Sequence, residues 1–228
     1  MFAPGMQKHD RCKYMDIRIL EKTDNFMICI KPAGVAVQTR KVGEEDMESI
    51  LRKKTGLDVY VIHRLDQPVE GITVWALDPS EAAYLSELVS RNGMKKKYLA
   101  YVRTDTGTML PDEGKLTDYL IKNGKTNLSS VVPEKTPGSK LSELEFKVLK
   151  RYEGKALVEI TLLTGRHHQI RVQFSHAGWP LVGDRKYGGE TGKKSNGPLC
   201  LCAYSLEFKD KNGKNRKYTV GPTWLVDQ

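Results

Sequence analysis

A short polar loop between two apolar segments carries the residues best suited to chemistry. It begins His63-Arg64-Leu65-Asp66 and continues to Gly71. A carboxylate at a strand end, close to a histidine and an arginine, can stay ionised beside the opposing cation while burial limits its hydration. Asp66 is therefore a candidate catalytic carboxylate. The alternative is that Asp66 only caps a turn, and the loop taken alone favours that structural role.

A second cluster follows at residues 164–171, with the sequence Thr-Gly-Arg-His-His-Gln-Ile-Arg. If a helix begins near His167, then His167, Arg171 and Ser175 share one face, and Arg171 can present a fixed guanidinium to a carboxylate. Adjacent histidines on a helix point about 100° apart. Because no third ligand is spaced nearby, the pair His167-His168 does not predict a metal site.

Hydrophobic periodicity and turn residues predict the elements that position these clusters. Helices are expected at 44–54, from Pro79 to a stop at Gly93 after an N-cap at Asp78, and from Ile170 to Ala177. Extended segments are expected at 17–20, 26–30, 35–37, 59–62, 72–76, 97–102, 144–150, 156–163, 199–208 and 216–220. A long polar excursion is expected at 104–140, with short extended pieces at 116–121 and 130–132. This order predicts one α+β domain with a mixed, mostly antiparallel sheet flanked by helices and loops.

The charge balance points to a polyanionic partner. The chain has 37 Lys and Arg against 28 Asp and Glu, a net charge of +9. Such a surface suits nucleic acid, because neutralised phosphates release their counterions. One basic cluster runs from Arg91 to Arg103 without an acid, and a second, at 209–217, surrounds Asn212-Gly213. For the second cluster a solvated hairpin turn is the favoured interpretation.

Size and composition exclude several other classes of protein. The 228 residues, 39% of them hydrophobic, suffice for a buried core without a disulfide scaffold. No apolar stretch approaches the roughly 20 residues of a membrane span, and residues 1–14 lack the apolar core of a signal peptide. We therefore expect a cytoplasmic protein without a membrane partner. The four cysteines, Cys12, Cys29, Cys200 and Cys202, form no CxxC pair and are expected to be buried or incidental thiols.

Three segments together resemble the motif regions of the RluA family of RNA pseudouridine synthases. They span 61–76, 96–102 and 157–188, and Lys31-Pro32-Ala33-Gly34 resembles the N-terminal motif of the same family. The similarity runs from about Ile17 to beyond Leu206. It implies the pseudouridine synthase fold over 17–228, after an N-terminal extension at 1–16 and without room for a separate S4-type RNA-binding domain. The family isomerises uridine to pseudouridine in ribosomal or transfer RNA, without a metal or organic cofactor.

The resemblance also implies roles for individual residues. Asp66 matches the catalytic aspartate, Tyr98 the active-site tyrosine that stacks on the target base, and Arg171 the arginine paired with the aspartate. Arg64 matches a position that in a relative fills the gap left by the extruded nucleotide. Further RNA contacts are expected from a group of basic and imidazole side chains: His63, Lys96, Lys97, Arg166 and His168. We expect a structured stem-loop as partner and a monomeric enzyme.

Three residues in two of the motifs depart from the family pattern. Val69-Glu70-Gly71 stands where most members have Thr-Ser-Gly, and His167 replaces a small hydroxylic residue. These departures bear on substrate choice, because Asp66, Tyr98 and Arg171 remain. Two other functional hypotheses stay open: an RNA-binding paralogue without catalysis, and a hydrolase that uses Asp66 and His63. The sequence also leaves open whether Asp66 attacks C1′ or removes the 2′ proton.

Overall fold

The computed structural model describes residues 17–39, 43–188 and 197–225. The expected N-terminal extension and Cys12 lie outside these residues. The chain divides into two compact units, one within residues 1–94 and 208–218 and the other within 95–207 and 219–228. Among the described residues, no helix is long and apolar enough to cross a membrane.

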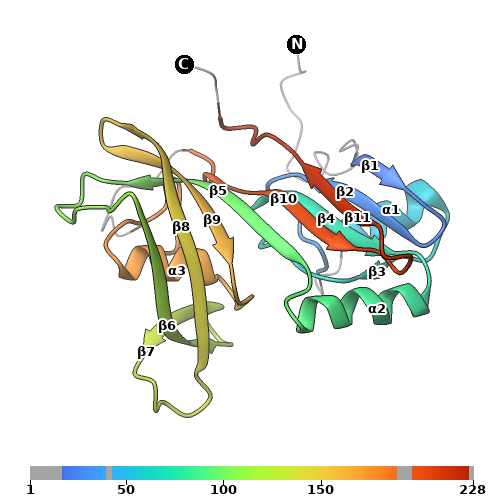
Figure 1. Cartoon of the computed structure of the whole chain (residues 1–228), viewed down its shortest axis with the longest axis horizontal. Helices are drawn as coiled ribbons and strands as arrows, with labels where there is room; N and C mark the ends of the chain where they lie inside the picture. Colours follow the sequence, from blue (N-terminus) through green and yellow to red (C-terminus); the bar gives the residue numbers. More distant parts are fainter. Residues whose placement is uncertain (1–16, 40–42, 189–196, 226–228) are drawn as a thin grey trace. The chain divides into compact units, whose positions relative to one another are not determined.

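The first unit is built around a fully buried strand. Its elements are β1 (Arg18–Lys22), β2 (Phe26–Lys31), α1 (Met47–Thr55), β3 (Tyr60–Val61), β4 (Glu70–Ala76), α2 (Pro79–Ser90) and β11 (Asn215–Thr219). Every residue of β4 is buried, and both β2 and β3 pair with it antiparallel. The helices begin where the sequence supplies caps: Asp46 accepts the N–H of Ser49, and Asp78 accepts the N–H of Glu81. The first unit thus places the Asp66 loop between β3 and the central strand β4 (Figure 1).

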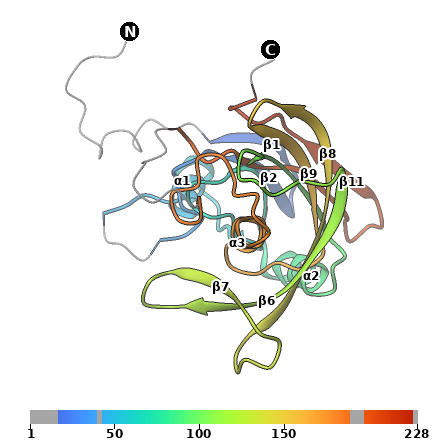
Figure 2. The ribbon, with the colours of Figure 1, turned by 90° about the vertical axis from the view of Figure 1, so that its left-hand side faces the viewer.

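The second unit is a run of antiparallel strands with one helix. Its elements are β5 (Lys95–Arg103), β6 (Glu113–Asn123), β7 (Leu128–Val132), β8 (Lys140–Tyr152), β9 (Lys155–Leu162), α3 (Gln169–His176) and β10 (Leu201–Lys209), whose last two residues belong to the first unit. The strand order is β10-β5-β9-β8-β6-β7. Phe174 of α3 packs edge-on against Phe146 of β8, with ring centroids 5.4 Å apart. Helix α3 therefore covers the sheet face on which Phe146 lies (Figure 2).

The predicted α+β class is confirmed, and most of the predicted elements are found within a few residues of their expected bounds. The clearest difference is the segment 104–140. The sequence predicts a polar excursion with short extended pieces, but the structure has β6, with 11 residues, paired to both β7 and β8. Only one face of β6 is covered: Leu120 is buried, whereas its neighbour Thr117 on the other face is exposed. Because polar residues occupy that open face, the segment lacks the hydrophobic pattern by which a buried strand is predicted from sequence.

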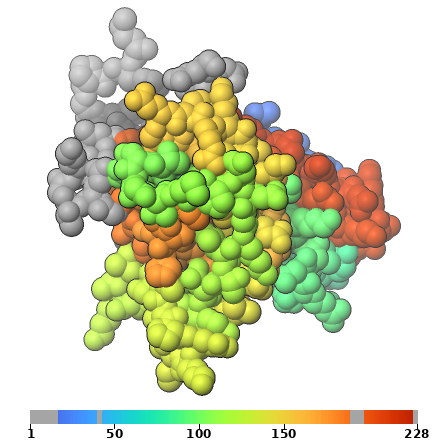
Figure 3. All heavy atoms as spheres, turned by 60° about the vertical axis from the view of Figure 1, so that its left-hand side comes forward, coloured from blue at the N-terminus to red at the C-terminus, as the bar shows by residue number. Residues whose placement is uncertain are grey.

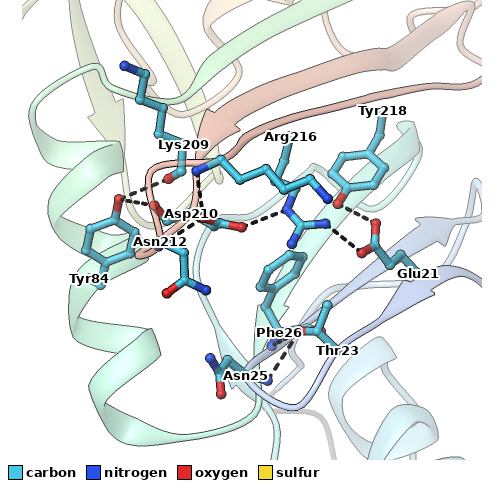
Figure 4. Close-up of polar contacts among 11 residues, drawn as sticks. Glu21, Thr23, Asn25, Phe26, Tyr84, Lys209, Asp210, Asn212, Arg216 and Tyr218 are labelled. Atoms are coloured by element: carbon cyan, nitrogen blue, oxygen red, sulfur yellow. Dashed lines mark hydrogen bonds and ion pairs between the residues drawn. The ribbon is translucent and has the colours of Figure 1, made fainter.

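The second basic cluster is the tip of the β10–β11 hairpin, as predicted, and its arginine is paired with two carboxylates. Asp210 accepts the N–H groups of Asn212 and Lys214 and the Nε of Arg216 at 2.8 Å. Arg216 also donates through Nη1 to Glu21 of β1 at 2.9 Å. Figure 4 shows this chain of contacts, with Arg216 between the two carboxylates. The hairpin is thereby fastened to the first unit by paired charges.

We expect Arg216→Met to destabilise the protein by about 2–3 kcal/mol, because it leaves the buried carboxylate of Asp210 without its cation. Urea unfolding followed by circular dichroism measures the change. Lys217→Met, at the next exposed position of the same strand, is the control and should leave the free energy of unfolding nearly unchanged. An equal loss in both variants would show that the ion pairs do not hold the hairpin.

Candidate functional site

The Asp66 loop is fixed by a buried lysine at the end of β2. The Lys31 side chain is fully buried, and its Nζ donates to the carbonyl oxygens of Pro32, Gln67 and Val69 at 2.9, 3.0 and 2.5 Å. Two of these carbonyls, those of Gln67 and Val69, lie on either side of Pro68 in the loop that carries Asp66. An ammonium group has three N–H donors, so all three are used. Lys31 therefore determines the path of the backbone on either side of Pro68.

Further hydrogen bonds join the same two segments. The N–H of Gly34 donates to the carbonyl of Gln67 at 2.8 Å, and the Gln67 amide donates back to the carbonyl of Gly34 at 3.0 Å. Within the loop, the N–H of Val69 donates to the carbonyl of Asp66 at 3.0 Å. The φ of Gly34 is +89°, a value that a residue with a side chain rarely adopts. The predicted N-terminal motif is thus part of the support of the Asp66 loop.

Charge and burial compete at Lys31. Burial lowers the pKa of the Lys31 ammonium to about 7, and the negative charges of Asp66 and Glu70 act in the opposite direction. Glu70, the first residue of β4, is itself buried. A carboxylate in place of the usual small residue at this position therefore adds negative charge beside Lys31. Asp66 and Lys31 form an electrostatic pair within the first unit.

The segment is a loop, as the sequence predicts, and two of its apolar residues are nevertheless buried. Leu65 and Val69 are buried and anchor it, whereas Asp66 between them is half-buried and Arg64 is exposed. The ring of His63 is half-buried, and its Nε2 accepts the N–H of Val74 at 3.3 Å. The buried anchors hold Asp66 at the margin between core and solvent. His63 is engaged with the β4 backbone at the start of the loop.

Tyr98 and Arg171 both belong to the second unit. Tyr98 lies opposite Ile160 of β9, and Ile160 lies opposite Phe146 of β8, so these side chains share one face of the sheet. Because α3 packs on Phe146, Tyr98 is on the face that carries α3. The Tyr98 ring is 7% exposed, which suits an aromatic side chain held in place by its strand.

Arg171 is held by a buried, bidentate ion pair. Its Nε and Nη2 each donate to a carboxylate oxygen of Asp184 at 2.8 Å, and both side chains are almost fully buried. Asp184 also accepts the N–H groups of Lys186 and Tyr187. Burial would raise the pKa of Asp184, but the hydrogen bonds from Arg171 and the backbone hold it below its usual value. The guanidinium therefore has a fixed plane before any ligand binds.

Helix α3 begins at Gln169, so the prediction of a start near His167 is wrong. His168 is the N-cap and adopts the left-handed conformation, with φ +55°. The turn before it is held by Gln169, whose Oε1 accepts from the backbone N–H of Arg166 and the hydroxyl of Thr164. Consequently His167 and Arg171 do not share a helix face. His167 instead faces β7, where Ser129 Oγ lies 2.9 Å from its Nδ1.

The remaining predicted RNA-binding residues occupy different settings. Lys97 forms an ion pair with Glu159 at 2.7 Å, and Lys96, half-buried on β5, has its pKa lowered by burial. Arg166 is exposed and donates to the carbonyl of Leu141. His168 is buried, with its Nδ1 2.8 Å from the hydroxyl of Tyr187. Direct contact with RNA remains a prediction for all four.

Several residues that build these sites were missed by sequence reasoning: Lys31 as a support, Glu70, Asp184, Ser129 and Tyr187. For Lys31 a signal existed, since a lysine directly after five apolar residues, four of them buried, and directly before Pro32 is an unusual place for a solvated charge. Asp184 had no comparable signal, because its partner is 13 residues away across a turn.

The described part of the chain contains three of the four cysteines. Cys29, Cys200 and Cys202 are buried free thiols, as predicted. Among the described residues, no group of three or more His, Cys, Asp or Glu side chains could hold a metal ion.

Comparison with known proteins assigns the class. Residues 25–176 match the family described as RNA pseudouridylate synthase, a stretch that includes Asp66, Tyr98 and Arg171. The chain belongs to this family, and its relatives place it in the RluA group. The fold agrees, since a human structure titled RNA Pseudouridylate Synthase Domain Containing 1 superimposes with a TM-score of 0.77 at 23% identity, covering 92% of this chain and 85% of that one.

The curated relatives include proteins named for both kinds of RNA. The chain is 30% identical to ribosomal large subunit pseudouridine synthase C of Haemophilus influenzae, over 96% of this chain and 69% of the relative. It is 34% identical to the Escherichia coli protein of that name, over 75% of this chain and 53% of the relative. It is 28% identical to tRNA pseudouridine synthase C of Vibrio parahaemolyticus, over 76% and 74%. The chain spans about half to two thirds of the length of the ribosomal relatives.

Lys31→Met should destabilise the protein by about 2–4 kcal/mol, because three carbonyls lose their donor in a buried setting. The unfolded lysine holds its proton up to about pH 10.5, whereas the folded one releases it near pH 7. Between these values the unfolded state binds more protons, so stability should rise with pH in the wild type relative to the variant. Urea unfolding from pH 6.5 to 10 tests this, with Lys22→Met at an exposed position as control. Parallel curves for wild type and Lys31→Met would contradict the prediction.

A second pH dependence should come from His168. Burial, with the charge of Arg171, lowers the pKa of its imidazole to about 3, so the ring is neutral in the folded protein. Below about pH 6.5 the unfolded chain takes up a proton that the folded chain refuses, and wild-type stability should fall between pH 6.5 and 3. His168→Asn stays neutral and tolerates the left-handed backbone, so it should lack this part of the acid sensitivity. Thermal or urea unfolding across that pH range measures the difference in acid sensitivity. Equal acid sensitivity in the wild type and the variant would show that His168 is not the source of this pH dependence.

Proposed function

We propose that this protein is an RNA pseudouridine synthase that isomerises uridine to pseudouridine in ribosomal or transfer RNA, with Asp66 as its catalytic carboxylate. The catalytic domain extends over residues 17–228. The observation that carries the proposal is the Asp66 loop itself: a half-buried carboxylate held in place by the three hydrogen bonds of Lys31, inside the stretch that matches the family. Relatives named for ribosomal and for transfer RNA support both as substrate classes.

The reaction has no net redox change and no hydrolysis. The bond between N1 and C1′ breaks, the uracil turns, and a bond forms between C5 and C1′. The proton on C5 is then lost and N1 gains one. Asp66 acts as an ionised carboxylate, either attacking C1′ or removing the 2′ proton, and Lys31 keeps the loop that carries it in one conformation.

Tyr98 and Arg171 complete the proposed machinery. Tyr98 stacks on the uracil and accepts the C5 proton, directly or through a water molecule. Arg171 opposes the carboxylate of Asp66. A guanidinium has five N–H donors, so the bidentate bond to Asp184 is compatible with a second carboxylate partner. Asp184 fixes the plane in which those donors lie.

The substrate uridine must leave its stack before the reaction can occur, at a cost of a few kcal/mol that is smallest in a loop. We propose that exposed Arg64 fills the gap left by the extruded nucleotide. His63, Lys96, Lys97, Arg166 and His168 support the bound RNA, the buried His168 through the position of its turn. We further propose a stem-loop target, a monomeric enzyme and a cytoplasmic location.

Asp66→Asn should lower the rate of pseudouridine formation by more than about 100-fold, because the amide can act neither as a base nor as a nucleophile. The encoding gene is deleted in its host, and pseudouridine is mapped at base resolution across ribosomal and transfer RNA. Sites that vanish should return with the wild type and with the control Asp24→Asn, in an exposed turn, but not with Asp66→Asn.

The other outcomes separate the alternatives. Full rescue by Asp66→Asn would refute the role of the carboxylate. If no site changes, the pure protein is assayed on synthetic RNA: binding without turnover indicates a non-catalytic RNA-binding protein, and release of free uracil indicates a hydrolase.

A further inference from the structure

Four exposed cations lie on two short segments of the second unit that carry no exposed acid. Lys122 and Lys125 belong to the β6–β7 hairpin, and no Asp or Glu occurs between residues 119 and 132. Arg185 and Lys186 follow Asp184, whose carboxylate is buried against Arg171. Within either segment, therefore, no exposed acid lies beside these four positive charges.

Hydrogen bonds bring the two segments together. Lys186 Nζ donates to the carbonyl of Asn127 in the hairpin turn at 2.9 Å, and the N–H of Ser129 donates to the hydroxyl of Tyr187 at 2.7 Å. Lys122 lies directly opposite Ser129 in the strand register, so both side chains point to the same face of the hairpin. Figure 3 shows the yellow-green hairpin segment beside the orange segment of α3 on one face. We call Lys122, Lys125, Arg185 and Lys186 the hairpin surface.

The hairpin surface is rigid before any partner binds. Ser129 Oγ donates to the carbonyl of His167 at 2.9 Å and lies at the same distance from its Nδ1. The side chain of Asn123 accepts the N–H groups of Lys125 and Thr126, which fixes the hairpin turn. A preorganised surface loses little conformational entropy on binding. His167, one of the departures from the family pattern, therefore takes part in fixing this hairpin.

The hairpin surface is also continuous with the guanidinium that the proposed reaction uses. The ring of Tyr187 lies 5.2 Å from the guanidinium carbon of Arg171, and the hydroxyl of the same Tyr187 accepts from the hairpin. Asp184, which holds Arg171, is adjacent to Arg185 in the chain. A chain of direct contacts thus leads from Arg171 through Tyr187 to Ser129 of the hairpin, the residue opposite Lys122 in the strand register.

We infer that the hairpin surface binds the phosphate backbone of the RNA strand that flanks the target uridine. This inference rests on the proposed function and names a substrate-binding surface for it. RNA fits better than a protein partner, because stable protein interfaces centre on buried apolar or aromatic anchors. The exposed large hydrophobic residues of the described chain, Leu57, Met109, Leu141 and Leu149, are not part of this surface. The contact reads backbone shape and supplies affinity.

Two charge-matched variants of the full-length chain test the inference. The first is K122Q/K125Q/R185Q, which leaves the Lys186 bond to Asn127 in place. The control is K209Q/K214Q/K217Q on the β10–β11 hairpin, where all three positions are also exposed. Each variant removes three positive charges, so the net charge falls equally. Fluorescence anisotropy with an unmodified, fluorescein-labelled tRNA transcript gives Kd between 50 and 300 mM KCl, and equal urea midpoints establish that both variants fold.

The first variant should bind the transcript at least tenfold more weakly, and the slope of log Kd against log salt should fall by about 2, since each lost phosphate contact removes about 0.7 to 0.9. The control should change affinity by less than threefold. An unchanged slope, or equal losses in both variants, would overturn the inference; an unchanged slope with loss of an RNA-independent protein complex would assign the surface to a protein. The proposed function fails separately, if the wild type makes no pseudouridine while the first variant still loses RNA affinity.

Discussion

The three hydrogen bonds of the Lys31 ammonium are the constraint on which the candidate site depends. Backbone carbonyls in a loop normally turn to water, but those of Gln67 and Val69 turn inward to one buried nitrogen. This arrangement fixes the backbone conformation of a segment that has no regular secondary structure. The backbone on both sides of Pro68 is thereby held in one conformation. The three bonds and two nearby carboxylates offset only part of the cost of burying the lysine charge, because burial still lowers its pKa to about 7.

The second unit also fixes a charged group with a buried ion of opposite charge, but the two signs are exchanged. Here the group to be fixed is a guanidinium, and the buried partner is the carboxylate of Asp184, which also accepts two backbone N–H groups. In both units a catalytic candidate at the end of an element is positioned by a buried ion of opposite charge that binds backbone atoms as well. Such ions contribute little net stability, but they select one loop conformation among many.

The sequence predicted the fold class, the N-cap of α2 and the central strands, because these follow from local patterns: the four buried apolar residues of β2, or Asp78 before Pro79. It failed where structure depends on distant partners. Helix α3 begins at Gln169 and not near His167, because the Gln169 side chain accepts hydrogen bonds from Thr164 and Arg166 in the preceding turn. Asp66 and Tyr98 were found through motif resemblance, whereas the support by Lys31 required the coordinates of a loop 36 residues away.

The two basic hairpins show why charge counts alone do not identify a binding surface. In the sequence the β10–β11 hairpin is a solvated turn rich in lysine, whereas the β6–β7 hairpin lies within a long polar excursion. In the structure the β10–β11 hairpin directs Arg216 to Asp210 and Glu21, so part of its charge serves the fold. The β6–β7 hairpin is fastened by neutral groups, Ser129 and the hydroxyl of Tyr187, and none of these bonds neutralises Lys122 or Lys125. Arg216 is thus committed to ion pairs within the fold, whereas the anchors of the β6–β7 hairpin leave the charges of Lys122 and Lys125 available to a polyanion.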